Sequence, residues 1–141
     1  MIDDSAAGLR ARVLVVDDEH TILAVVRDAL ECEGYSVDTA VSGEEALETA
    51  ERQRPDLIVL DVNLPDLDGW EVLSRLRATA GPQTPVVVMT AGFAAQDQAL
   101  ASGAQGYLGK PFGLQDLLIA VESHAHLPME GARETVRRFA R

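Results

Sequence analysis

The stretch VLVVDDEH, residues 13–20, places three consecutive acidic residues directly after an apolar run. Such a short, continuous apolar run is typical of a buried strand. Carboxylates side by side repel one another, and burial raises the cost of keeping them charged. This octet alone leaves two interpretations open. The acids either solvate a turn or cap the following helix, or they belong to a site at the end of the strand.

Five short apolar runs recur along the chain, and each is followed by a helical pattern. They cover residues 12–16, 35–40, 56–60, 85–90 and 106–109. Alternating strands and helices, with near-continuous apolar strands, are typical of a parallel sheet covered by helices on both faces. We therefore predict an α/β fold with a doubly wound five-stranded parallel sheet, in a flavodoxin-like three-layer sandwich.

Apolar residues at i, i+3, i+4 and i+7 mark the helical segments. After the first run, one helix face is predicted to hold Ile22, Val25, Val26, Ala29 and Leu30. The next helix begins near Ser42, which forms a predicted capping box with Glu45. The last helix is predicted from the spacing of Leu114, Leu117, Leu118 and Val121. The segment between residues 90 and 105, rich in small residues, gives the weakest helical pattern.

Polar residues follow four of the five predicted strands. Asp17 and Asp18 follow the first, Asp61 the third, Thr90 ends the fourth, and Lys110 follows the fifth. In open parallel sheets, ligands bind beyond the carboxyl ends of the strands, at the point where the strand order reverses. The shared position of these residues favours a site over a solvated turn.

The residue types at this edge suit phosphoryl transfer. Asp17, Asp18 and Asp61 would repel one another unless a cation joined them, and hard oxygen ligands favour Mg²⁺. Lys110 is the only lysine among 12 Lys and Arg residues, and it supplies a compact point charge. With the Thr90 hydroxyl, this set suits transfer of a phosphoryl group onto a carboxylate. Asp61, at the end of the central strand, is the best-placed nucleophile.

Four motifs, in this order and spacing, resemble the receiver domain of bacterial two-component response regulators. They are VLVVDDE, DLIVLDVNLPDLDGWEVL, PVVVMTA and GAQGYLGKPF, within a match of about residues 11–126. The resemblance implies that Asp61 accepts a phosphoryl group from a phosphohistidine on a sensor kinase. It also implies that Asp18 and Asp61 ligate magnesium directly, that Asp17 acts largely through water, and that the backbone carbonyl of Asn63 is a further ligand.

The same resemblance assigns the switch residues. Thr90 and Tyr107 occupy the switch positions, where the hydroxyl moves toward the phosphoryl oxygens and the aromatic ring turns inward. Ala91 follows the threonine, where small residues are normal. Lys110 is expected to form an ion pair with the acyl phosphate. The peptide bond between Lys110 and Pro111 is expected to be cis.

The resemblance implies Mg²⁺ as the cofactor and a sensor histidine kinase or phosphotransfer protein as the partner, with an unknown downstream protein target. Chemistry is expected to be limited to self-catalysed phosphotransfer and slow autodephosphorylation, so we do not predict an enzyme. A net charge of −11 argues against direct nucleic-acid binding. No apolar run reaches the roughly 20 residues of a membrane span. A single cysteine, Cys32, fits a reducing cytoplasm. We expect a monomer or weak homodimer.

Three alternatives remain to be weighed. A magnesium-dependent phosphatase of the haloacid dehalogenase type needs a second acid two residues after the nucleophile, where this chain has Asn63. A flavin-binding module needs a phosphate-binding loop after the first strand, where acids stand instead. A receiver-like interaction module that has lost phosphorylation would not need the full set of acids, hydroxyl and lysine.

The domain boundaries are predicted as an N-terminal extension over residues 1–10, a receiver over 11–126 and a tail over 127–141. The start of the chain is acidic and does not resemble a signal peptide. In the tail, Met129, Ala132, Val136 and Phe139 share one helix face. The tail is expected to be either a short amphipathic helix or the stub of a linker. The chain is accordingly either a stand-alone receiver or a receiver taken from a longer protein.

Overall fold

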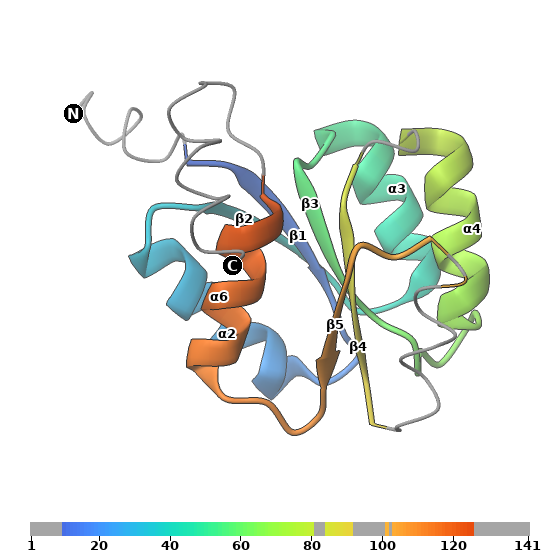
Figure 1. The fold of residues 1–141 in the computed structure, drawn as a ribbon. Coiled ribbons are helices and arrows are strands. Elements are labelled where there is room, and N and C mark those ends of the chain that lie inside the picture. Colours follow the sequence, from blue (N-terminus) through green and yellow to red (C-terminus); the bar gives the residue numbers. More distant parts are fainter. Residues whose placement is uncertain (1–9, 81–83, 92–100, 102, 126–141) are drawn as a thin grey trace.

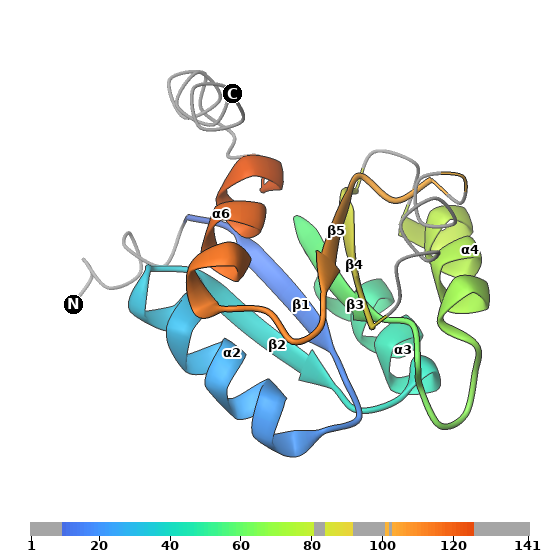
Figure 2. The same ribbon diagram turned by 60° about the horizontal axis from the view of Figure 1, so that its bottom comes forward.

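The computed structural model describes residues 10–80, 84–91, 101 and 103–125. Five parallel strands form one sheet in the order β2-β1-β3-β4-β5. The strands are β1 (Arg12–Val16), β2 (Ser36–Ala40), β3 (Leu57–Asp61), β4 (Val86–Thr90) and β5 (Gly106–Gly109). The described helices are α2 (His20–Cys32), α3 (Gly43–Gln53), α4 (Gly69–Ala80) and α6 (Leu114–His124). Helices α2 and α6 cover one face of the sheet, and α3 and α4 cover the other (Figures 1 and 2). The predicted doubly wound α/β sandwich is confirmed.

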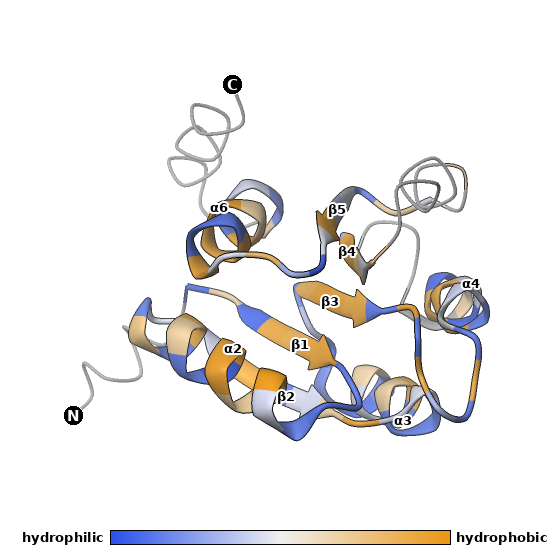
Figure 3. Ribbon diagram, turned by 90° about the horizontal axis from the view of Figure 1, so that it is seen from below, coloured by the Kyte–Doolittle hydropathy of each residue, from blue (hydrophilic) through white to orange (hydrophobic). Residues whose placement is uncertain are grey.

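The core is divided by the sheet into two clusters, because successive side chains of a strand point to opposite faces. Val13 and Val15 of β1 pack on the side of α2 and α6. Leu14 and Val16 pack on the side of α3 and α4. All residues of β3 and β4 are buried, and Figure 3 shows β3 as hydrophobic while the helices also carry hydrophilic residues. Burial on both faces explains why these strands read as continuous apolar runs.

The buried face of helix α2 is shifted from the predicted face, which held Val25 and not Leu23. Leu23, Val26 and Leu30 are buried, but Val25 is 46% exposed. Likewise, Leu114 at the start of α6 is 46% exposed. Helical spacing thus identifies Val25 and Leu114 as apolar positions of their helices, but neither is buried in the core.

The predicted capping box of α3 is half correct. The Ser42 hydroxyl accepts a hydrogen bond from the Glu45 N–H at 3.1 Å, as expected. The Glu45 carboxylate, however, accepts from the Val41 N–H at 2.8 Å and not from that of Ser42. The return hydrogen bond is therefore shifted by one residue toward the strand.

Residues 1–9, 81–83, 92–100, 102 and 126–141 lie outside the described part of the chain, and with them the tail and most of the weak helical segment. Arg10, which the predicted boundaries place in the N-terminal extension, contacts the fold. Its guanidinium lies 4.8 Å from the centre of the Tyr35 ring and 3.0 Å from a Glu122 carboxylate oxygen. Within the described residues, no helix has the length and apolar character needed to cross a membrane.

Candidate functional site

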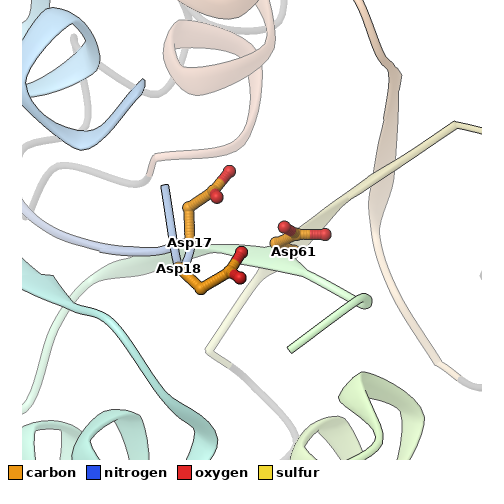
Figure 4. Close-up of side chains that lie close together, drawn as sticks. All are labelled: Asp17, Asp18 and Asp61. Carbon is orange, nitrogen blue, oxygen red and sulfur yellow. The ribbon is translucent and has the colours of Figure 1, made fainter. Parts of the chain in front are cut away.

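The carboxyl ends of β1 and β3 bring three aspartates together. These strands are direct neighbours in the sheet, with Val16 opposite Leu60. Asp17 and Asp18 follow β1, and Asp61 is the last residue of β3 (Figure 4). One carboxylate oxygen of each lies within 4.8 Å of the others. Repulsion between three such groups requires nearby positive charge.

Two of these aspartates are buried. Asp17 is 0% and Asp61 2% exposed, whereas Asp18 is exposed. Within the described residues, Thr49 is the only buried polar or charged residue apart from Asp17, Asp61 and Thr90. Three of the four buried polar residues in the described part of the chain therefore lie at this edge of the sheet, where burial without nearby charges or hydrogen bonds would be costly.

Each buried carboxylate has one backbone donor, and the two share one cation. Oδ1 of Asp17 accepts from the Glu19 N–H at 2.9 Å, and Oδ1 of Asp61 accepts from the Asn63 N–H at 2.9 Å. Nζ of Lys110 lies 3.0 Å from Oδ2 of Asp17 and 3.1 Å from Oδ2 of Asp61. The lysine therefore neutralises one of the two buried charges.

The electrostatics of the site leave negative charge in excess. Burial raises the pKa of Asp61 above its ordinary value of 3.8, and the charge of Asp17 raises it further, against the Asn63 N–H and Lys110. Burial alone would lower the pKa of Lys110, but its hydrogen bonds to Asp17 and Asp61 and their charges raise it above 10.5. The Lys110 ammonium is therefore protonated at neutral pH. Ionisation of Asp61 in the folded protein, by contrast, costs free energy.

The donor set fits a magnesium ion. The cluster holds three carboxylates and the ammonium group of Lys110 contacts two of them, so a divalent cation would relieve the remaining repulsion. Magnesium prefers hard oxygen ligands and keeps several bound waters. The exposed position of Asp18 leaves one side of the cluster open to water, as such an ion requires.

The predicted switch residues lie on β4 and β5. Thr90 ends β4 and is 5% exposed, and its carbonyl accepts from the Lys110 N–H at 2.8 Å. Ala91 is exposed beside it. Tyr107 is half-buried, and its hydroxyl would lie 3.3 Å from a Cβ atom added at Gly109. Its ring therefore lies close to the backbone two residues ahead. The Lys110–Pro111 peptide bond is cis.

A family model described as a response regulator receiver domain matches residues 13–122. The chain belongs to this family. The receiver is 44% identical over 114 residues to the response regulator MprA of Mycobacterium leprae, covering 79% of this chain and 50% of that protein. It is 41% identical over 128 residues to the MprA of Mycolicibacterium vanbaalenii, covering 88% of this chain and 55% of that protein. The receiver thus spans about half the length of these curated relatives.

Solved structures give the same family. The chemotaxis protein CheY4 of Vibrio cholerae is similar to this receiver with a TM-score of 0.75 and 36% sequence identity, covering 81% of this chain and 98% of that chain. A CheY-like receiver domain protein of Methanospirillum hungatei is similar with a TM-score of 0.72 and 30% identity, covering 92% of this chain and 95% of that chain. The family model and the similar solved structures therefore identify the same family and the same α/β fold.

Sequence reasoning missed an apolar groove of about 550 Å³ beside the acidic cluster of this receiver. It runs between the start of α2 and the segment that joins β5 to α6. Its apolar lining includes Ile22, Val25, Phe112 and Leu114, and it reaches Lys110. Val25 and Leu114 are apolar residues that could have indicated this groove. Helical periodicity alone, however, groups each with the apolar face of its helix.

Proposed function

We propose that Asp61 accepts a phosphoryl group from a phosphohistidine of a sensor histidine kinase or phosphotransfer protein, and that the modified receiver controls a downstream protein. One observation carries this proposal: Asp61 is a buried carboxylate at a strand end, contacted by the chain's only lysine and beside two further aspartates. This is the arrangement expected of a nucleophile that must tolerate added negative charge.

The transfer places an Asp61 oxygen in a new bond to phosphorus. The bond between phosphorus and the donor imidazole nitrogen breaks, and the imidazole leaves with the electron pair. Oδ2 of Asp61 already faces Lys110, whose ammonium can follow the developing charge onto the phosphoryl oxygens. The Asn63 N–H holds Oδ1 and so fixes the orientation of the carboxylate.

The ligands proposed for magnesium are Asp17, largely through water, together with Asp18, Asp61 and the backbone carbonyl of Asn63. When bound, the ion would supply positive charge that offsets the phosphoryl oxygens.

Thr90 and Tyr107 are the proposed switch pair. Thr90 ends β4, the strand next to β3, and in this proposal its hydroxyl reaches a phosphoryl group on Asp61. Tyr107 lies on the next strand, opposite Val88. Ala91, with a single methyl group, leaves space for the movement, and Lys110 with Pro111 carries the change into the loop after β5.

The groove beside Lys110 is the proposed docking surface for the kinase. A phosphohistidine must approach Asp61 from solvent, and this apolar groove adjoins the contact between Lys110 and Asp61. Exposed Val25 and Leu114 would be covered by a helical partner. Exposed apolar patches of this kind mark interaction sites.

A phosphatase of the haloacid dehalogenase type is the weaker candidate. Asn63, which stands where that chemistry places a general acid, uses its backbone N–H to orient Asp61. We further propose that the receiver acts in the cytoplasm, as a monomer or weak homodimer. In this proposal it is a signalling domain without enzymatic turnover and does not bind nucleic acid directly.

The experiment that tests the proposed function is labelling with acetyl phosphate or a beryllofluoride mimic. We expect modification of Asp61 alone, with a requirement for magnesium. Asp61→Asn should stay folded and inert, since the amide is nearly isosteric with the carboxylate. Mass spectrometry that finds the phosphoryl group on another residue, or undiminished labelling of the variant, would refute the proposal.

A further inference from the structure

The loop between β3 and α4, residues 62–68, directly follows Asp61, and its two ends are joined to each other. The Gly69 N–H donates to the Val62 carbonyl at 3.0 Å, and Asn63 pairs with Asp68 in an antiparallel bridge. A Cβ atom added at Gly69 would lie 2.1 Å from the Val62 Cα atom, so the two ends of the loop approach very closely. These contacts make the loop a compact turn, but they do not attach it to the neighbouring helix.

Asp66, in the middle of this loop, supplies that attachment. Its Oδ1 atom accepts from the Gly43 N–H at 2.8 Å, and its Oδ2 atom accepts from the Glu44 N–H at 3.0 Å. Both donors belong to the first turn of α3, where N–H groups lack partners within the helix and the helix dipole favours an anion. The hydrogen bond from Gly43 is the main cause that lowers the pKa of the Asp66 carboxyl.

Close packing accompanies the hydrogen bonds. A Cβ atom added at buried Gly43 would lie 2.8 Å from Val72 Cγ2 and 3.0 Å from Leu67 Cβ. The first turn of α3 therefore lies directly against both the loop and α4, with no space for a side chain between them. A shift of the loop would have to break the Asp66 contacts and this packing together.

The same loop positions Asn63, whose N–H holds the Asp61 carboxylate at 2.9 Å. We propose that Asp66 is a positioning residue for the phosphoryl-acceptor site. By tying the loop to α3, it holds Asn63 where its N–H orients Asp61 and where its carbonyl serves as a magnesium ligand. This inference rests on the proposed magnesium site. Asp66 itself stands outside the acidic cluster and contacts α3 instead.

Ser42 offers a matched control, because it caps the same helix without belonging to the loop. Its hydroxyl accepts from the Glu45 N–H at 3.1 Å. Asp66→Ala and Ser42→Ala each remove a side-chain cap from α3, and loss of such a cap typically costs about 1 kcal/mol of stability. Only Asp66→Ala releases the loop. The pair therefore separates loss of helix capping from loss of loop position.

The test measures magnesium affinity by calorimetry on the unphosphorylated protein. It also measures the magnesium concentration that gives half-maximal phosphorylation by acetyl phosphate. We expect Asp66→Ala to weaken magnesium binding about tenfold, the low end of the effect of residues that orient metal ligands. Ser42→Ala should keep the wild-type affinity. Asp66→Asn, which retains one acceptor oxygen, should lie between Asp66→Ala and the wild type.

Unchanged magnesium affinity in Asp66→Ala would reduce Asp66 to a helix cap and overturn the inference. Equal weakening in Asp66→Ala and Ser42→Ala would also overturn it, because the effect would then pass through α3 and not through the loop. If circular dichroism shows that Asp66→Ala does not fold, Asp66→Asn is compared with Ser42→Ala in its place. A wild-type protein that binds no magnesium would instead contradict the proposed function.

Discussion

The Nζ atom of Lys110 lies 3.1 Å from Oδ2 of Asp61, so the only lysine of the chain contacts the proposed phosphoryl acceptor. The same atom lies 3.0 Å from Oδ2 of Asp17, and the lysine side chain is only 20% exposed. A single compact ammonium group thus bridges two buried carboxylates. Every other cation in the chain is an arginine. The contact points to a steric requirement as well as a requirement for charge.

Lys110→Arg tests that requirement, because it preserves the charge. A guanidinium is planar and bulkier and cannot act as a point charge between two carboxylates. We expect phosphorylation of Asp61 by acetyl phosphate to persist while the conformational response is lost. NMR chemical shifts of Thr90 and Tyr107 before and after beryllofluoride addition measure the response. A full response in the arginine variant would show that charge alone is sufficient.

Asp61→Asn should stabilise the magnesium-free protein at neutral pH. Burial, then repulsion from Asp17, raises the pKa of Asp61, so the folded protein binds its proton more tightly than the unfolded chain. Ionisation of Asp61 therefore costs stability as the pH rises through the raised pKa, and the amide removes that cost. A gain of about 1 kcal/mol would raise the Tm by roughly 3–5 °C in a domain of this size.

The gain in stability should shrink as the pH falls. It should vanish below the ordinary carboxyl pKa of about 4, where the Asp61 carboxyl of the wild type is protonated in both the folded and the unfolded states. Thermal unfolding at several pH values without magnesium provides the measurement. Asp28→Asn, which neutralises an exposed carboxyl on α2, is the control. A variant less stable than wild type at pH 7 would mean that the Lys110 contact outweighs burial and repulsion.

Magnesium should raise the Tm of the wild-type protein, because an ion that binds only the folded state stabilises it. The gain is about 2.7 kcal/mol at a magnesium concentration one hundred times the Kd. Asp18→Asn should remove most of this gain with little effect in the absence of magnesium, since Asp18 is exposed. Asp28→Asn again serves as the control. A wild-type Tm that does not respond to millimolar magnesium would eliminate the metal site.

Much of this site could be predicted from the sequence because strand ends and polar residues coincide along the chain. Asp17, Asp61 and Thr90 each follow or end a continuous apolar run, and parallel strands deliver their carboxyl ends to one edge. The exposure of Val25 and Leu114 could not be predicted, since periodicity identifies an apolar face but not what covers it. The role of Asp66 was invisible because its partner, the start of α3, lies 22 and 23 residues away in sequence.

The close contact made by Gly69 could not be predicted either, because the sequence around it indicates only a turn. An added Cβ atom would lie 2.1 Å from the backbone of Val62, so Gly69→Ala must force the loop open. We expect a loss of about 1–3 kcal/mol in the free energy of unfolding, the typical cost of overpacking. Gly113→Ala is the control, because its Cβ atom would meet only Asp116 Oδ2, at 3.6 Å. Denaturant unfolding that places both variants within about 0.5 kcal/mol of each other would contradict the close approach.

The groove beside Lys110 gives the last prediction, which separates kinase docking from phosphoryl chemistry. The kinase is first identified by phosphotransfer profiling against the sensor kinases of the source organism. Val25→Asp places a charge in the groove. The control is Ile119→Asp, which places a charge on an apolar residue of α6 outside the groove. The two residues are similarly exposed, at 46% for Val25 and 52% for Ile119. We expect Val25→Asp to lower kcat/KM for transfer from the kinase about tenfold, equivalent to about 1.4 kcal/mol of lost contact. Labelling by acetyl phosphate should be unchanged in both variants, because that small donor needs no docking surface. Equal kinase transfer to the two variants would place the docking surface elsewhere.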